Sequence, residues 1–468
     1  MTANADLSTP GPAPVTTPIH GRLPREPHEV TTRPLHVTGS AGDGVLLVSG
    51  LSADGVRERY LFLDLGAGTV RELTVDITDQ RGRHATWLGA ELDGDALPYG
   101  TSTVEQLLPY FLHPHSFVQT RSGHVAVFFK QAPYIRLVDP GAGQGGGDHR
   151  RWPAAGEEEV ARMVGSTACE GRPGVLSFAI SEAEDRLLRY RGADSPVQSG
   201  LWEWGSVGEP RRVGALPRFA LDTVHDVLTS PAGFTVAVDM NLTVDAVADA
   251  ASDLDVATYA AADFPEGRFA VVDGDVEIVQ ETSTPCSAHV DLDLEDDQVF
   301  YVSCNNISKW RNDVVVHGPG VVEKYRYVAG AVELLGSFTR PDFHRITSQV
   351  LFRWEGRQLM AVTGYPNKLF LLDARTMTLV DCVELFAETH TEPPYACAKN
   401  GTAPLYLAVR DGMVYLTSAT RLHVVDLRSR RVVATADFCE PGTLAATAHV
   451  GFVETPVAAV GTFSPAVR

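Results

Sequence analysis

Short apolar runs recur along most of the chain, each about as long as one β-strand. Gly, Asp and Asn separate them at intervals of roughly eight to twelve residues, which is typical of antiparallel all-β proteins. The runs that show this most plainly are Gly44–Gly50, Arg59–Asp64, Val125–Phe129, Arg268–Asp273, Gln298–Ser303, Leu359–Thr363, Lys368–Asp373, Met413–Thr417 and Arg421–Asp426. The pattern predicts the fold class all-β.

Two segments repeat one unit, in which an apolar strand ends in Asp and a polar turn leads into a second strand. They are Leu371–Val380 and Val424–Val433. Such repetition along most of a long chain favours radial blades, and therefore a β-propeller, over a single sandwich. A pair of sandwiches or a β-helix is the alternative architecture.

Other segments break this pattern. Residues 1–35 are rich in Pro, Thr, Ala and Gly and have no apolar core, so we expect a disordered leader, not a signal peptide. Residues 36–468 are then a single propeller domain. Val244–Ala262 is rich in Ala with interspersed Asp, which predicts a helical or loop cap inserted around residues 244–262 over one face. Glu157–Val164 is a candidate short helix.

Charge and cysteine usage restrict the classes of partner. A net charge of −20 argues against binding to nucleic acid or to an anionic membrane, because both need clustered Lys and Arg. The six cysteines are widely scattered, which suits reduced thiols in a cytoplasmic protein better than a disulfide scaffold. No apolar stretch approaches the roughly eighteen residues that a membrane-spanning helix needs.

Histidines are the residues with the most chemical information. Nine of them lie in or near the leader, in loops or in outer-strand contexts, where no metal-binding role is expected. Five precede or begin apolar strands: His113, His115, His225, His289 and His449. A lone strand histidine is usually only hydrogen-bonded. In a propeller, however, the innermost strands face one axis, so histidines far apart in sequence can converge there.

Four patches, in the same order, resemble the carotenoid cleavage oxygenase family. Asp222–Leu242 resembles the family's His-Asp-Phe motif with its trailing Asp-x-x-Leu, and Phe269–Val299 resembles the stretch with the third histidine. Arg340–Ile346 and Leu422–Phe452 resemble the later Glu-containing and Gly-Phe-His-Gly regions. The resemblance implies a seven-bladed propeller that holds a non-haem iron with four histidines, in a distant relative of the apocarotenoid and stilbene oxygenases.

The resemblance also implies the residues of the site. His225, His289 and His449 match three ligands. The family's His-Pro dipeptide favours His113 as the fourth, whereas counting back from the turn at Gly123 favours His115. Outer carboxylates that orient the histidines match Asp342 and Glu392, and Glu91 is a guess for a third. The chain departs from the family at Leu292-Asp293, at Asp342 in place of Glu, and in placing His449 before Gly451-Phe452.

The chemistry fits that ligand set. Four neutral imidazoles on an octahedral Fe(II) leave two positions open for O₂ or water, with a substrate double bond held nearby. Carboxylates behind the imidazoles fix their orientation and offset the charge. The chain has no Lys before Lys130, so the lysine of the phenol clamp in the family's stilbene cleavers is absent, while Tyr60, Tyr99 and Tyr110 remain as possible contacts. The acidic cap suits water better than lipid.

Three hypotheses follow. The first is a soluble Fe(II)-dependent dioxygenase that cleaves a carbon–carbon double bond of an apolar or aromatic alkene with O₂ into carbonyl products. The second keeps the four-histidine metal but performs an isomerase, lyase or other oxidative tailoring reaction of secondary metabolism. The third is a metal-free propeller that acts as an interaction scaffold, because one architecture hosts many functions.

Overall fold

The computed structural model describes the strands and most of the turns between them. The described residues are 28–79, 81–82, 85, 112, 114–119, 125–129, 135–138, 140, 150–152, 163–172, 175–182, 198–205, 211–215, 224–239, 267–274, 276–283, 286–305, 307–310, 313–316, 319–343, 346–364, 368–385, 406–418, 420–444 and 449–454. Among the cysteines whose side chains are described, Cys304, Cys382 and Cys439 are free thiols.

The described strands form seven sheets of four or five strands, numbered here in chain order and given from centre to periphery. Sheet 1 contains β32 (Val450–Val453), β3 (Val45–Leu51), β4 (Arg57–Asp64), β5 (Thr69–Asp76) and β1 (His28–Pro34). Sheet 2 contains β6 (Pro114–Gln119), β7 (Val125–Phe129), β8 (Ile135–Val138) and β9 (Arg150–Trp152). Sheet 3 contains β10 (Met163–Arg172), β11 (Val175–Glu182), β12 (Gln198–Gly205) and β13 (Arg211–Ala215).

The remaining sheets repeat the same order. Sheet 4 contains β14 (Val224–Thr229), β15 (Thr235–Asp239), β16 (Arg268–Asp273) and β17 (Val276–Glu281). Sheet 5 contains β18 (Cys286–Leu292), β19 (Val299–Asn305), β22 (Val321–Val328) and β23 (Ala331–Thr339), with a two-stranded insertion of β20 (Ile307–Trp310) and β21 (Asp313–Val316). Sheet 6 contains β24 (Ile346–Trp354), β25 (Arg357–Gly364), β26 (Lys368–Asp373) and β27 (Thr378–Glu384). Sheet 7 contains β28 (Tyr406–Arg410), β29 (Met413–Ser418), β30 (Arg421–Asp426), β31 (Arg431–Asp437) and β2 (His36–Gly39).

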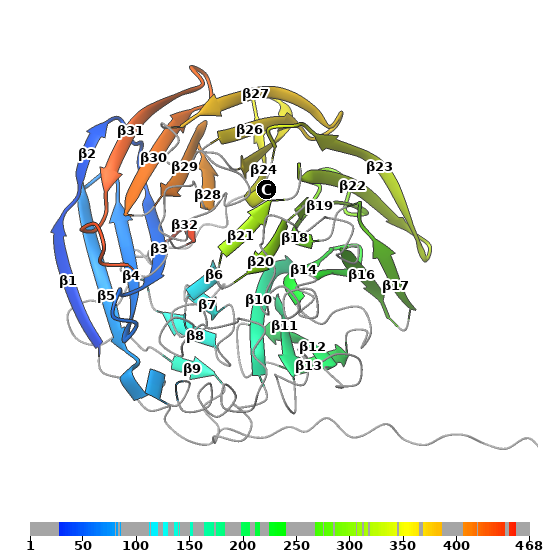
Figure 1. Cartoon of the computed structure of the whole chain (residues 1–468), viewed down its shortest axis with the longest axis horizontal. Helices are drawn as coiled ribbons and strands as arrows, with labels where there is room; N and C mark the ends of the chain where they lie inside the picture. The colour runs from blue at the N-terminus through cyan, green and yellow to red at the C-terminus, as the bar shows by residue number, and fades with distance from the viewer. Residues whose placement is uncertain are drawn as a thin grey trace, which may run out of the picture.

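These sheets stand around a common centre (Figure 1). Successive innermost strands contact one another from β6 through β10, β14, β18, β24 and β28 to β32, and β6 also contacts β3 of sheet 1. Neighbouring strands within each sheet are antiparallel. The all-β propeller architecture expected from the sequence is therefore confirmed.

Both ends of the described chain close this ring. The last strand, β32, pairs with β3 and becomes the innermost strand of sheet 1. An early strand, β2, pairs with β31 and becomes the outermost strand of sheet 7. The first and last sheets therefore each contain strands from opposite ends of the sequence, so neither sheet is complete until both ends are in place.

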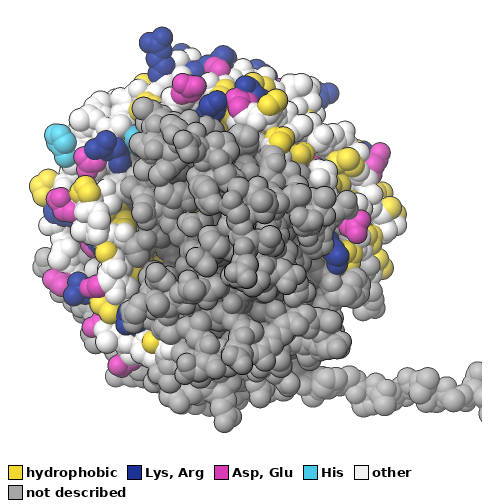
Figure 2. Space-filling view, in the orientation of Figure 1, with side chains coloured by type: hydrophobic (Ala, Val, Ile, Leu, Met, Phe, Trp, Pro, Cys, Tyr) yellow, Lys and Arg dark blue, Asp and Glu magenta, His cyan; other side chains and the backbone are white. Residues whose placement is uncertain are grey.

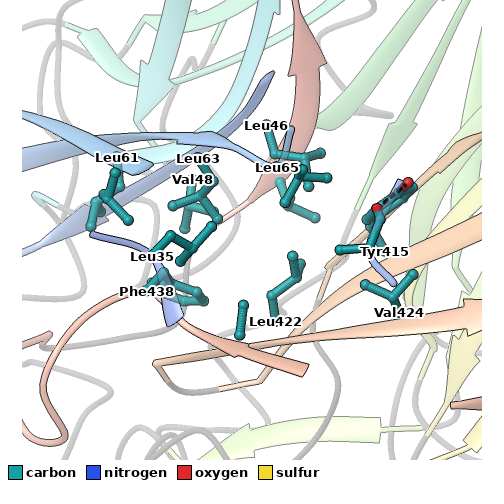
Figure 3. Packing of buried hydrophobic residues seen from close by; sticks show 14 of the residues in the cluster. Leu35, Leu46, Val48, Leu61, Leu63, Leu65, Tyr415, Leu422, Val424 and Phe438 are labelled. Atoms are coloured by element: carbon teal, nitrogen blue, oxygen red, sulfur yellow. Dashed lines mark hydrogen bonds between the residues drawn. The ribbon is translucent and has the colours of Figure 1, made fainter. Parts of the chain in front are cut away.

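The hydrophobic core lies in layers between adjacent sheets. Between sheets 1 and 7, Leu46, Val48 and Leu61 pack against Leu422 and Phe438 (Figure 3). Similar layers join sheets 1 and 2, 4 and 5, 5 and 6, and 6 and 7. Because each sheet has a neighbour on both faces, its central strands are apolar on both faces, and this is why the sequence shows continuous apolar runs.

A buried ion pair joins sheets 1 and 2. Arg136 of β8 and Glu58 of β4 are both fully buried and form a salt bridge, with a second contact of 3.0 Å from Nη2 to Oε1. The Tyr60 hydroxyl donates to the other oxygen of Glu58 at 2.7 Å. Tyr60 is thus fully buried between two sheets, and the expectation that it contacts a substrate phenol is wrong.

Two further expectations need correction, and a third concerns residues outside the described ranges. Residues 28–34, which were expected to belong to a disordered leader, form β1 and pair with β5, whereas residues 1–27 lie outside the described residues. The helix expected up to Val164 is wrong at its end, because β10 begins at Met163. The cap expected around 244–262 lies outside the described residues.

Acidic and basic side chains are interspersed around the described rim of the face that Figure 2 shows. In the part of the chain that the structure describes, no helix is long and apolar enough to cross a membrane.

Candidate functional site

The innermost strands all begin at the same end of the ring. Sheets 2–7 each contain four antiparallel strands that follow chain order from the centre outward, so the chain returns to this end before it enters the next sheet. β32 also begins at this end, because it runs antiparallel to β3, the second strand of its sheet. His115 lies near the start of β6 and His225 near the start of β14, His289 is the middle residue of β18, and His449 directly precedes β32. The backbone therefore brings four candidate ligand positions to one end of the ring.

A β-bulge recurs at this end of the innermost strands. On β6 the ladder shifts between Pro114 and Ser116, which makes His115 the extra residue. On β14 the shift between Val224 and Asp226 makes His225 the extra residue. On β18 the extra residue is Ala288, immediately before His289. Bulges re-aim a side chain and are common beside functional sites.

The residues that pair with the second strand of each sheet show which positions on different innermost strands lie at the same height along the ring axis. His289 is paired with Ser303 and Tyr406 with Thr417. His449 is bonded to Ser49 through a 3.2 Å hydrogen bond from the Ser49 amide to its carbonyl. These three second-strand residues are buried hydroxyl side chains, and Ser303 Oγ accepts the His289 amide at 3.2 Å. His289, His449 and Tyr406 therefore occupy equivalent positions in three different sheets.

Carboxylates lie beside His289. Asp226 Oδ2 of sheet 4 accepts the Val290 amide of sheet 5 at 3.1 Å and lies 3.9 Å from His289 Nδ1. That separation is too long for a hydrogen bond but close enough for strong electrostatic interaction. Asp291, two residues along the same strand, has an enclosed Oδ2 for which the described residues provide no hydrogen-bond partner. Burial and the nearby Asp226 charge raise the pKa of Asp291 well above its usual value.

An aromatic ring covers His449. The rings of Tyr406, at the start of β28, and His449 are stacked with centroids 3.5 Å apart and planes inclined by 25°. Both residues are half-buried. Tyr406 belongs to sheet 7 and His449 leads into sheet 1, so this contact crosses the seam at which the ring closes.

The remaining predicted site residues are described to different extents. His113, Glu91, Glu392, Tyr99 and Tyr110 lie outside the described residues, and only the backbone is described for His115 and His225. Among described side chains, no group of three or more His, Cys, Asp or Glu is arranged to hold a metal ion. The Asp342 carboxylate accepts hydrogen bonds from Arg340 at 2.6 and 2.9 Å and from Lys368 at 2.9 Å. These two cations lower the pKa of Asp342.

Long connections join the strands at the end where the innermost strands begin. They include 77–113, 240–267, 306–320 and 385–405. At the opposite end several turns are tight, as at 329–330, 355–356 and 411–412, although the β8–β9 connection spans 139–149. The third of these connections carries the β20–β21 hairpin, which lies over the ring centre in Figure 1. Long loops held on a rigid scaffold commonly carry function, so we treat this end as the candidate functional face.

Sequence reasoning did not assign a role to Asp226, Asp291 or Tyr406. Asp226 follows a candidate ligand directly, and that adjacency was a usable signal. Tyr406 had no local signal, because its partner His449 lies in another sheet.

Comparisons with known proteins agree with the fold. No family profile matches the sequence, and no curated protein matches it. A mutant of the Synechocystis apocarotenoid oxygenase aligns with a TM-score of 0.51 and 12% identity, covering 92% of this chain and 97% of its own. An ACO/RPE65 chimera aligns with a TM-score of 0.50 and 13% identity over the same shares. AztD from Citrobacter koseri gives a TM-score of 0.43 at 10% identity, covering 87% of this chain and 97% of its own.

Proposed function

We propose that this protein is a non-haem Fe(II)-dependent dioxygenase that cleaves a carbon–carbon double bond of an apolar or aromatic alkene with O₂, giving two carbonyl products. The observation that supports the proposal is that four candidate histidines lie on, or directly before, the innermost strands of four different sheets, toward the end where those strands begin. The fold that this chain shares with an apocarotenoid oxygenase also supports the proposal.

His225, His289, His449 and His115 would hold the iron. His115 is preferred over His113 because it occupies the same bulge position on β6 that His225 occupies on β14. The donor set fits Fe(II), since neutral imidazole binds this ion well and a carboxylate stands beside the Nδ1 edge of His289. When bound, the iron would supply open positions at which O₂ and the alkene are brought together.

The chain's own residues would orient the ligands and shield the site. Asp226 stands where a proton on His289 Nδ1 is attracted to it, which would leave Nε2 as the metal-binding nitrogen. Asp342 and Glu392 remain proposed outer carboxylates. Both oxygens of Asp342 are engaged by Arg340 and Lys368, so it would act through that network. The β20–β21 hairpin would exclude water from the centre.

Metal analysis of protein purified without oxygen tests the first half of the proposal. We expect about one iron per chain in the wild type. His225→Ala and His289→Ala should each lose most of it, while His36→Ala, at an exposed residue of β2, should retain it. A wild-type protein with no stoichiometric transition metal, or a His225→Ala variant with unchanged metal content, would contradict it.

Labelled oxygen tests the reaction. Apocarotenoid and stilbene alkenes are incubated with the iron-loaded protein under ¹⁸O₂, and the products are analysed by mass spectrometry. Carbonyl products that contain ¹⁸O support oxidative cleavage. An isomerised or eliminated product without ¹⁸O would favour the alternative metalloenzyme reactions, and a metal-free protein that converts no alkene would favour the scaffold.

A further inference from the structure

We propose that Tyr406 is a positioning residue of the site, which sets the plane of the His449 imidazole by ring stacking. The inference rests on the proposed function, because it treats His449 as a metal ligand. It adds to that function a non-ligating aromatic residue that determines where one ligand points.

Tyr406 lies at the same level of the ring as the candidate ligands. It is paired with the buried Thr417 of the second strand, just as His289 is paired with the buried Ser303. Sheet 7 therefore presents a phenol ring at the position where sheet 5 presents an imidazole. This equivalence brings Tyr406 next to His449 across the seam between sheets 7 and 1.

The stacked geometry restricts His449 in one particular way. With centroids 3.5 Å apart and planes within 25°, the phenol covers one face of the imidazole. Rotation of the imidazole about its Cβ–Cγ bond would drive its edge into the phenol ring, so the plane of the imidazole is held. Both ring nitrogens bind in that plane, and the phenol therefore limits the directions along which His449 can bind a metal without binding it itself.

The backbone of His449 is held from the other side. Its carbonyl accepts the amide of Ser49 at 3.2 Å, which ties it to β3 of sheet 1. Main chain and side chain of the same residue are thus fixed by two different sheets. Residues that orient a metal ligand typically change metal affinity by about 10- to 100-fold when they are removed.

Cobalt binding to the full chain tests the proposal. Co(II) is titrated into metal-free wild type, Tyr406→Phe and Tyr406→Leu, and the visible d–d spectrum is recorded. Tyr406→Phe keeps the ring, so its affinity and spectrum should match those of the wild type. Tyr406→Leu keeps similar bulk without the ring, so we expect at least about tenfold weaker binding and a shifted spectrum.

If Tyr406 only stabilised the fold, a change in Co(II) binding would accompany a loss of stability in either variant. Tyr406 also packs against the core between sheets 1 and 7, so denaturant unfolding of each variant is measured alongside. If Tyr406→Leu does not fold, Tyr406→Met serves as the second ring-free variant. Equal Co(II) binding by the wild type and a folded ring-free variant would overturn the role of Tyr406 and leave the proposed function intact.

A second measurement needs no metal. Protein with ¹³C-labelled histidine rings is observed by NMR, and the His449 signal is assigned with His449→Gln. Stacking on Tyr406 displaces that signal through the ring current, so Tyr406→Leu should move it while Tyr406→Phe leaves it in place. An unmoved signal overturns the stacking itself, whereas failure of the wild type to bind any Co(II) overturns the proposed function.

Discussion

At the scale of single residues, burial affects the charge of His423. His423 lies on β30 with only 8% of its surface exposed. Burial, reinforced by the positive charge of Arg421, lowers the pKa of His423 to about 4. The unfolded chain takes up a proton near pH 6.5 and the folded chain does not, so stability is lost as pH falls from about 6.5 to about 4.

Replacing this histidine removes that pH dependence. We expect the free energy of unfolding of the wild type to fall by roughly 3 kcal/mol more than that of His423→Leu between pH 7 and pH 4. Urea unfolding at a series of pH values measures it. The exposed His36→Gln serves as the control and should keep the wild-type slope; an unchanged slope in His423→Leu would show that His423 also titrates when folded.

The ion pair between Glu58 and Arg136 gives a second prediction. Glu58→Gln leaves the Arg136 charge buried without its counter-charge, so we expect a loss of about 3–5 kcal/mol in the free energy of unfolding. The double variant Glu58→Leu/Arg136→Met should be more stable than Glu58→Gln, because no buried charge remains.

Tyr60→Phe, which removes one hydrogen bond to Glu58, should cost only about 1 kcal/mol in the free energy of unfolding. Denaturant unfolding separates these values, and a double variant less stable than Glu58→Gln would contradict the account.

The candidate site was only partly predictable at this scale. The starts of apolar strands pointed to His113 or His115, His225, His289 and His449 as candidate ligands. Of these, His115, His225 and His289 lie on innermost strands and His449 directly precedes one, while their role as ligands stays a prediction. Asp226 and Tyr406 contact His289 and His449, respectively, across sheet boundaries. Such contacts depend on how sheets are arranged around the ring, which local sequence does not encode.

At the scale of elements, strands were predictable where both faces are buried. The expected runs at 125–129, 268–273, 368–373 and 421–426 coincide with β7, β16, β26 and β30. β1 escaped prediction because it is an outermost strand with mostly exposed, polar residues, His28-Glu-Val-Thr-Thr-Arg-Pro34. Its strand character comes from pairing with β5, not from an apolar pattern.

The turn between β22 and β23 gives a prediction for an element. Ala329 has a φ of 50° and Gly330 a φ of 80°, as in the two-residue hairpin turns that favour Asn-Gly. A left-handed Ala costs roughly 1 kcal/mol, and Asn tolerates this conformation better. Ala329→Asn should therefore raise the free energy of unfolding by about 0.5–1 kcal/mol.

The matched control is Ala331→Asn, two residues later in β23, where Asn is unfavourable in a strand. It should leave stability unchanged or lower it. Thermal and urea unfolding of both variants give the comparison. Equal effects of Asn at the two positions would mean that the left-handed conformation of Ala329 carries no cost.

At the scale of the whole molecule, ring closure is the feature that sequence patterns did not reveal. β2 and β32 are short, and each pairs with a strand from the other end of the chain. Apolar periodicity predicts that a segment is a strand but not which sheet it joins. The closing contacts also bring Tyr406 beside His449, so the seam of the ring and one part of the proposed site are the same place.

A disulfide across the seam tests how much closure contributes. Thr38 of β2 and Thr435 of β31 are register partners, and their hydroxyl oxygens lie 2.7 Å apart although 397 positions separate them in sequence. Neighbouring strands at this spacing suit a disulfide. Thr38→Cys/Thr435→Cys should oxidise readily and raise the free energy of unfolding by up to about 5 kcal/mol, because the cross-link restricts the unfolded chain. Comparing oxidised with reduced protein isolates the cross-link, and each single variant controls for the lost hydroxyl. An oxidised double variant no more stable than its reduced form would mean that β2 separates from β31 without unfolding the ring.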